Sequence, residues 1–134
     1  MNRSKAREQA FLILFQRAFD DDAVLSALLK RSVENNYITE EMFTKELCEV
    51  AFANIKEIDE LLVVNSERWQ LGRLSKVAVS VLRLAIAEIK YMDNVPFKVS
   101  INEAIELAKK FSGEEESSFV NGVLAGIVKD VKKS

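Results

Sequence analysis

Basic and aromatic side chains near the two ends of the chain are the residues best suited to chemistry. Arg3, Lys5 and Arg7 occur within the first seven residues, and Phe15 follows them. Near the other end, Phe119 stands in the stretch "ESSFVNGVLAGIVKD". Cations neutralise phosphates and aromatic rings stack on unpaired bases, so this combination is typical of a surface that binds single-stranded nucleic acid. A solvated helix start is the alternative interpretation of the cations.

Residues for catalysis and for metal binding are scarce. The chain has no histidine, which removes the commonest general base and the commonest metal ligand. Its single cysteine, Cys48, cannot build a zinc site, and the sequence contains no glycine-rich phosphate loop. We therefore expect no catalytic residues, no metal and no cofactor. A binding or scaffolding module fits this composition better than an enzyme.

The composition predicts an all-α protein. Among 134 residues only four are glycine, and Pro96 is the only proline, so helix breakers are rare. The hydrophobic share of 49% and the charged share of 30% are typical of a globular chain with a real core. No apolar run reaches the roughly 18 residues that a transmembrane helix needs. With no export signal either, we expect a cytoplasmic protein with no membrane partner.

The first helix must position the N-terminal cations. Residues 4–19 have a helical period, and Phe11, Leu14 and Phe15 share one apolar face. Ile13 falls opposite that face, where it would suit the seam of a homodimer. The same helix therefore suits either an RNA-binding edge or a protein interface.

A long apolar segment, "KVAVSVLRLAIAEIKYM", follows Ser75 and predicts a buried central helix. Arg83 is the lone charge deep in this segment. Because an unpaired buried charge is very costly, we expect Arg83 to pair with a carboxylate, for which Glu88 and Glu103 are candidates, or to cap a helix end. Ser100 and Glu103, in "SINE", have the spacing of a capping box that would begin the next helix.

The last predicted helix, over about residues 117–132, contains two of the four glycines. At 100° per residue, Gly122 and Gly126 fall just beside the apolar arc, next to Phe119 at its edge. This strip of small residues has two interpretations, and the residues alone leave both open. A neighbouring helix packs closely against it, or a ligand approaches it with Phe119 as a stacking platform.

Three stretches resemble the NusB family of transcription antitermination factors: "KAREQAFLILFQ", "WQLGRLSKVAVSVLRLAIAE" and "VPFKVSINEAIELAKKFSGEEESSFVNGVL". The resemblance covers residues 3–19 and 69–128. It implies an all-α fold of about seven helices in two small packed bundles, a function without catalysis, and one compact domain. We expect the N-terminal half to span 1–68 and the C-terminal half 69–134.

The resemblance also implies partners. NusB proteins bind the boxA segment of nascent RNA, usually together with NusE, a ribosomal protein, and help RNA polymerase to read through terminators, chiefly in ribosomal RNA operons. The positions that match the family's RNA-binding ones are Arg3, Lys5, Arg7, Phe15, Glu115 and Phe119. The resemblance leaves Gly122 and Gly126 as close-packing residues that set where Phe119 points.

Some positions depart from the family's pattern. Gly72 and Ala78 stand where other members carry acids that face NusE, and the three acids at 114–116 would repel phosphate. The alternative function is therefore a protein–protein scaffold, or a homodimeric interaction module, with little direct RNA binding.

Overall fold

Helices form the regular structure of the residues that this computed structural model describes, 1–67 and 73–133, and no strand occurs among them. Their bounds are α1 Arg3–Phe19, α2 Leu25–Glu34, α3 Met42–Ala53, α4 Ile55–Asn65, α6 Lys76–Tyr91, α7 Phe97–Phe111 and α8 Glu114–Lys133. The predicted all-α class is confirmed. The expected division between residues 68 and 69, and Gly72 with it, lies outside the described ranges.

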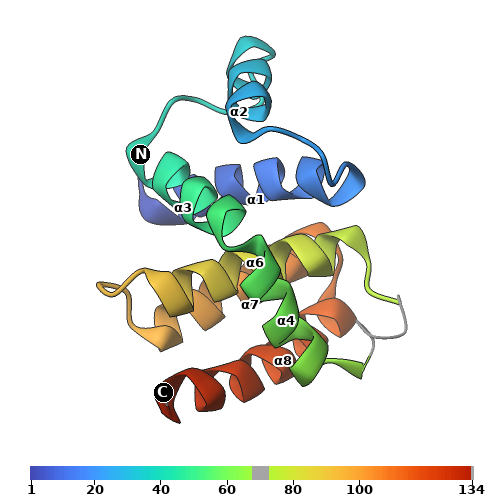
Figure 1. The fold of residues 1–134 in the computed structure, drawn as a ribbon. Coiled ribbons are helices and arrows are strands. Elements are labelled where there is room, and N and C mark those ends of the chain that lie inside the picture. The colour runs from blue at the N-terminus through green and yellow to red at the C-terminus, as the bar shows by residue number, and fades with distance from the viewer. Residues whose placement is uncertain (68–72, 134) are drawn as a thin grey trace.

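The central helix of the fold is α6. Its side chains are buried from Ala78 to Ile89, because α1, α3, α4, α7 and α8 all pack against it. In Figure 1, α1 and α3 lie above α6, α8 lies below it, α7 overlaps it, and α2 stands at the top against α1 and α3. An apolar surface all round a helix needs neighbours on every side, so the prediction of a buried central helix is confirmed. None of the described helices is both long and apolar enough to cross a membrane.

The ion pair of Arg83 differs from the prediction. Its Nε and Nη2 atoms donate to the two carboxylate oxygens of Asp59 on α4, each at 2.9 Å. Glu88 follows five residues later, about 140° round the helix at 100° per residue, so it faces a different neighbour. The expectation of a Glu88 or Glu103 partner was therefore wrong, although the expectation that Arg83 is paired was right.

The expected capping box at Ser100 was also wrong. The helix α7 begins one turn earlier, at Phe97, with Pro96 as its N-cap residue. Proline suits a helix start because its fixed φ is helical and it has no N–H to lose. Ser100 therefore lies inside the helix, and its hydroxyl donates to Glu88 Oε1 at 2.5 Å.

The helix α1 is covered on more sides than its sequence pattern indicates. It packs against α2, α3, α6 and α7, and Ile13 is fully buried. The expected dimer seam through Ile13 is therefore wrong, because that side of α1 meets the rest of the fold.

The two glycines of α8 have different surroundings. A Cβ on Gly126 would lie 2.9 Å from Asn65 Oδ1, so α4 packs closely there and the close-packing prediction is confirmed. Gly122 is exposed, and a Cβ there would meet nothing within 4 Å. The close-packing prediction is therefore wrong at Gly122, where the helix surface is open one turn after Phe119.

Candidate nucleic-acid interface

The start of α1 presents two exposed cations. Asn2 caps the helix by accepting a hydrogen bond from the backbone N–H of Lys5 at 2.8 Å. The guanidinium carbon of Arg3 lies 4.3 Å from the ring centroid of Phe43, so the ring holds this side chain at the surface. Lys5 is 59% exposed and lies 3.4 Å from Glu8 Oε2. Both charges are therefore open to an anionic ligand.

Arg7 points inward, although it was expected at the RNA surface. Only 4% of the residue is exposed. Its Nε lies 2.9 Å from Glu88 Oε2, and its Nη1 lies 3.6 Å from Glu103 Oε1. The hydroxyl of Ser100 donates a hydrogen bond to Glu88 at 2.5 Å, and that of Ser4 donates one to Glu103 at 2.6 Å. This network is buried at Arg7, Glu88 and Ser100 and exposed at Ser4; it joins α1 to α6 and α7 and fixes the start of α1.

Four phenylalanine rings form a continuous row along α1 and the end of α7. Phe11 stacks on Phe111 with ring centroids 4.7 Å apart, and it lies 5.8 Å from Phe15. Phe15 in turn meets Phe19 edge to face at 5.1 Å. We call these four residues the phenylalanine row. Phe11 is buried, but Phe111 is 38% and Phe19 65% exposed, so the row reaches the surface at both ends.

A lysine stands over each exposed end of the phenylalanine row. Lys110 Nζ lies 5.5 Å from the Phe111 centroid, and Lys76 Nζ lies 5.6 Å from the Phe19 centroid. Lys110 also contacts Glu8 Oε1 at 2.6 Å. This hydrogen bond lowers the pKa of Glu8, and the charges of Lys110 and Lys5 add to the effect against the opposing effect of burial. Glu8 therefore stays ionised and links the row to the start of α1.

Sequence reasoning found only part of this surface. It named Phe15 but missed Phe19, Phe111, Lys76 and Lys110. A signal was present, since phenylalanine recurs every fourth residue at 11, 15 and 19, which places the three rings on one side of α1. The contribution of α7 depends on how two distant helices pack, which no local pattern contains.

The start of α8 lies near the far end of α1, away from Arg3 and Lys5. Ser75, which caps α6, hydrogen-bonds to Glu116 on α8, and the next residue, Lys76, reaches Phe19. Phe119 is half-buried and packs against the core, while Glu115 is exposed. The expected site residues are therefore spread along α1, which is about 25 Å long for 17 residues at 1.5 Å each.

Few of the described residues are arranged for metal binding or for thiol chemistry. No three carboxylate or cysteine side chains there gather into a group that could hold a metal ion. Cys48 is buried, and burial raises the pKa of its thiol to about 12, with a further contribution from the charge of Glu49. Ala78, expected at a partner-facing position, is fully buried in the first turn of α6. This arrangement suits the binding of a ligand by charge and stacking.

Comparisons with known proteins identify the same family along nearly the whole chain. The model of the NusB family matches residues 4–129. A transcription antitermination protein NusB from Natranaerobius thermophilus is 39% identical over 138 residues, which cover 100% of this chain and 99% of that protein. The NusB of a crystal structure of antitermination factors NusB and NusE in complex with dsRNA has a TM-score of 0.84 at 30% identity, covering 96% of each chain. The T. maritima NusB structure has a TM-score of 0.83 at 34% identity, covering 97% of this chain and 92% of that one.

Proposed function

This chain belongs to the NusB family, and from that premise we propose that it is a transcription antitermination factor that binds boxA-type single-stranded RNA together with NusE. The complex would help RNA polymerase to read through terminators, chiefly in ribosomal RNA operons, and would act in the cytoplasm. The protein contributes binding and assembly to this process and no catalytic step.

The observation that supports RNA binding best is the phenylalanine row with its two lysines. Phe19 and Phe111 are partly exposed, and an unpaired base can stack on either ring once the lysine over that ring turns aside. Lys76 and Lys110 stand where the phosphates of a stacked strand would pass. A single strand is therefore the form of RNA that this surface fits, although the related NusB–NusE crystal structure holds a duplex.

The proposed path runs from the exposed cations at the start of α1, along the phenylalanine row, to Phe119 and the open surface at Gly122. Two of the three acids at the start of α8 are engaged by other residues. Glu116 contacts Ser75, and Glu114 Oε1 lies 3.7 Å from Lys109 Nζ. Lys109 partly offsets the charge of Glu114, which lowers the repulsion of phosphate that the acidic stretch would otherwise cause. The roles of Arg3, Lys5, Phe15, Glu115 and Phe119 in RNA binding remain part of this proposal.

Arg7 has a different role in this proposal. Because its guanidinium is buried against Glu88 and Glu103, it acts as a positioning residue that sets the direction of α1. Arg3 and Lys5, one helix turn or less before it, then supply the charges that meet RNA.

The test compares two aromatic variants of equal exposure. Phe19 and Tyr37 are each 65% exposed, but Tyr37 lies before α3, away from the phenylalanine row. We expect Phe19→Ala to weaken binding of a boxA-like single-stranded RNA roughly 5- to 150-fold, since stacking contributes about 1–3 kcal/mol per base. Tyr37→Ala should bind as the wild type does. Fluorescence anisotropy with labelled RNA, with and without NusE, gives both affinities.

Two further measurements decide between this function and a protein scaffold. The same RNA annealed into a duplex should bind more weakly, because its bases cannot reach the rings. The logarithm of the affinity should fall with the logarithm of the salt concentration, with a slope of roughly −0.7 for each cation that contacts a single strand. The scaffold would be favoured if no RNA binding occurred even with NusE present. It would also be favoured if the Phe19→Ala variant and the wild type bound RNA with equal affinity.

A further inference from the structure

A small pocket lies at the start of α1, beside the cations assigned to RNA. Its lining comes from Arg3, from Phe43 and Glu46 on α3, and from residues 91–95, which end α6 and turn toward α7. Figure 1 shows these three segments at one end of the molecule, near the N-terminus. The volume of the pocket is about 270 Å³, just below the roughly 300–1,000 Å³ of pockets that hold drug-sized ligands. The pocket therefore suits a ligand of the size of one nucleobase.

One wall of the pocket is a supported guanidinium group. The guanidinium carbon of Arg3 lies 4.3 Å from the ring centroid of Phe43, which is buried. The buried Arg7 also contacts this ring, with its guanidinium carbon 5.3 Å from the centroid, and so helps to hold the ring in place. The side chain of Arg3 makes no ion pair with any other residue that the structure describes. A guanidinium plane held in this way is a surface on which an unpaired base stacks.

The other polar groups of the pocket are two carboxylates and an amide. Glu46 follows Phe43 by three residues, so the two side chains are neighbours on one side of α3. Asp93 and Asn94 lie in the turn after α6. All three polar side chains are exposed, and none of them hydrogen-bonds or pairs with another residue in the described ranges. They are therefore available to a ligand that enters the pocket.

These groups distinguish bases by the Watson–Crick edge. An ionised carboxylate only accepts hydrogen bonds, so it repels the carbonyl oxygens of uracil. Guanine alone among the four bases has two adjacent donors on this edge, N1–H and the N2 amino group, which can bond to both oxygens of one carboxylate. The O6 carbonyl of guanine can accept a hydrogen bond from the amide of Asn94. The hydroxyl of Tyr91, which also lines the pocket, is already bonded to Glu57.

We propose that this pocket binds one guanine of the RNA strand, stacked on Arg3 and hydrogen-bonded to Glu46 and Asn94. The inference rests on the function proposed above and adds the base that the protein reads. The phenylalanine row and its lysines hold a strand whatever its sequence, whereas contacts to a base edge specify the sequence. A phosphate is a poorer occupant, because Glu46 and Asp93 repel it. A metal ion is poorer too, because no three acids gather here or elsewhere in the described parts of the chain.

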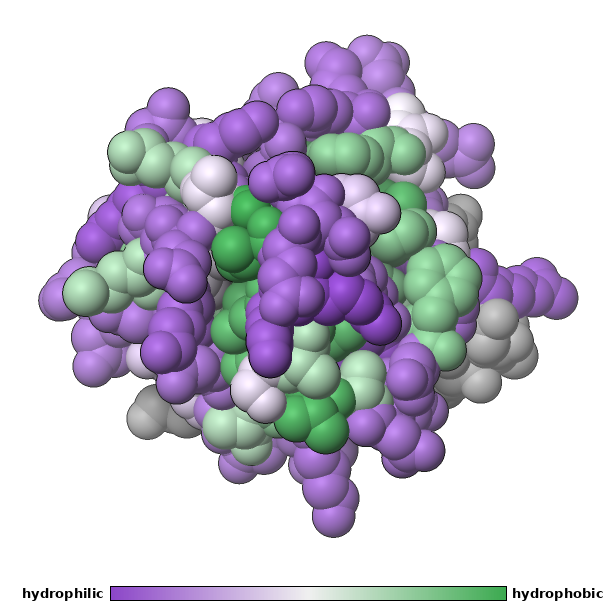
Figure 2. Space-filling model, turned by 90° about the horizontal axis from the view of Figure 1, so that it is seen from above, coloured by the Kyte–Doolittle hydropathy of each residue, from purple (hydrophilic) through white to green (hydrophobic). Residues whose placement is uncertain are grey.

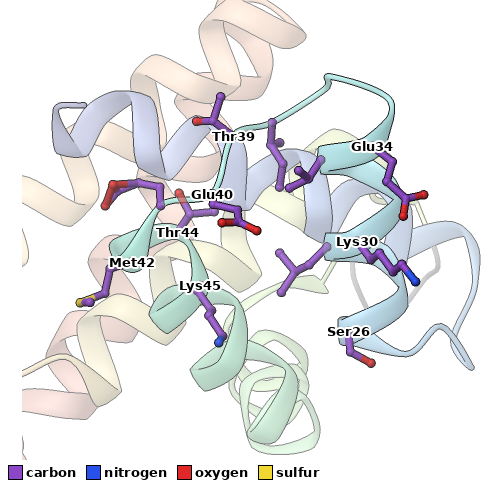
Figure 3. Close-up of a pocket in the computed structure, with 12 residues that line it drawn as sticks. Ser26, Lys30, Glu34, Thr39, Glu40, Met42, Thr44 and Lys45 are labelled. Atoms are coloured by element: carbon purple, nitrogen blue, oxygen red, sulfur yellow. The ribbon is translucent and has the colours of Figure 1, made fainter.

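A groove between α2 and α3 supplies the matched control. The face seen from the α2 side is mostly hydrophilic, with apolar side chains at its middle (Figure 2). Figure 3 shows Glu40 among the side chains that line the groove. The groove shares no lining residue with the guanine pocket. Glu40 is exposed, as Glu46 is, so Glu40→Gln removes the same charge away from the proposed base site.

The test compares short oligo(U) RNAs that differ only in one central base, which is G, A, C or U. A uniform strand can shift its register, so the single guanine can reach the pocket. Fluorescence anisotropy with NusE present gives the affinity of each RNA for the wild type and for each variant. The readout is the ratio of the affinities for the G and U strands, because the loss of a negative charge strengthens the binding of every RNA alike.

We expect the wild type and Glu40→Gln to bind the G strand at least about fivefold more tightly than the U strand, the lower end of what a bidentate contact to a base gives. Glu46→Gln should bring this ratio close to one, since a carboxamide has only one acceptor oxygen. Arg3→Lys should also lower the ratio but leave the salt dependence unchanged, because lysine keeps the charge and lacks the plane.

The outcomes separate this inference from the proposed function. Equal affinities of the wild type for all the RNAs overturn the inference and leave the proposed function intact. A guanine preference that survives in Glu46→Gln also overturns it, because another surface then reads the base. No binding of any RNA, even with NusE, overturns both. Circular dichroism should show wild-type folding for all the variants, since Arg3, Glu40 and Glu46 are exposed.

Discussion

Replacement of Arg7 by methionine tests whether this residue positions α1 or contacts RNA. Methionine keeps helix propensity and fills much of the space of the arginine stem. The change removes the donor that lies 2.9 Å from Glu88 Oε2. Glu88 is 2% exposed and would keep only the hydrogen bond from Ser100 among the contacts described above. The variant therefore leaves a buried carboxylate without its cation.

The cost follows from that burial. Removal of one partner from a buried ion pair destabilises a protein by about 3–5 kcal/mol, because the remaining charge is not solvated. At about 3–5 °C per kcal/mol for a chain of this size, the melting temperature should fall by on the order of 10–20 °C. Urea denaturation followed by circular dichroism gives the free energy of unfolding directly. RNA affinity, measured well below the new melting temperature, should change little.

Two control variants separate stability from binding. Lys5→Met removes an exposed cation from the same helix, and it should leave the free energy of unfolding nearly unchanged while weakening RNA binding. Arg7→Met combined with Glu88→Gln should be less unstable than the sum of the single changes, with a coupling of about 0.5–3 kcal/mol. The reasoning is refuted if Arg7→Met costs less than about 1 kcal/mol, a loss typical of surface changes, while RNA binding is lost.

Two further predictions concern packing. Gly122→Ala should stabilise the protein by about 0.5–1 kcal/mol through helix propensity, because a Cβ there would meet nothing within 4 Å. Gly126→Ala should stabilise it less, because its Cβ would lie 2.9 Å from Asn65 Oδ1 and the tip of that side chain must shift. Urea denaturation of the two variants measures the difference, and equal effects would contradict the packing described. Burial raises the pKa of the Cys48 thiol to about 12, so the thiol should stay protonated at about pH 8. Iodoacetamide labelling followed by mass spectrometry should therefore modify Cys48 only in denaturant. Labelling of the folded protein at the unfolded rate would contradict its burial.

The sequence predicted the helices and the buried centre well because both depend on local spacing. The apolar run after Ser75 required neighbours on all sides, and α6 has them. The edge position of Phe119 followed from the same periodicity, and the residue is half-buried. Each of these predictions depends on the pattern within a single helix, and residue spacing contains that pattern.

The errors arose where a side chain's partner belongs to another helix. Arg83 needed an acid, but only the packing of α4 against α6 brings Asp59 to it. Ser100 had the spacing of a cap, yet it serves the buried Glu88 because Pro96 begins the helix one turn earlier. The one member of the phenylalanine row that comes from α7 was missed for the same reason, since Phe111 reaches Phe11 only through tertiary packing.

Arg7 is buried while Arg3 and Lys5 are exposed, and the geometry of α1 against its neighbours explains this difference. Arg7 follows Arg3 by four residues and Lys5 by two, so at 100° per residue it lies about 40° from the first and 160° from the second. That rotation turns Lys5 toward solvent, while the first turn still projects Arg3 past the end of the core, over Phe43. Arg7, one turn deeper, meets α6 and α7 and must be paired there. The three cations were predicted to be equivalent RNA contacts, but Arg7 positions the helix and only Arg3 and Lys5 are exposed charges. The Arg7 and Lys5 variants measure this difference.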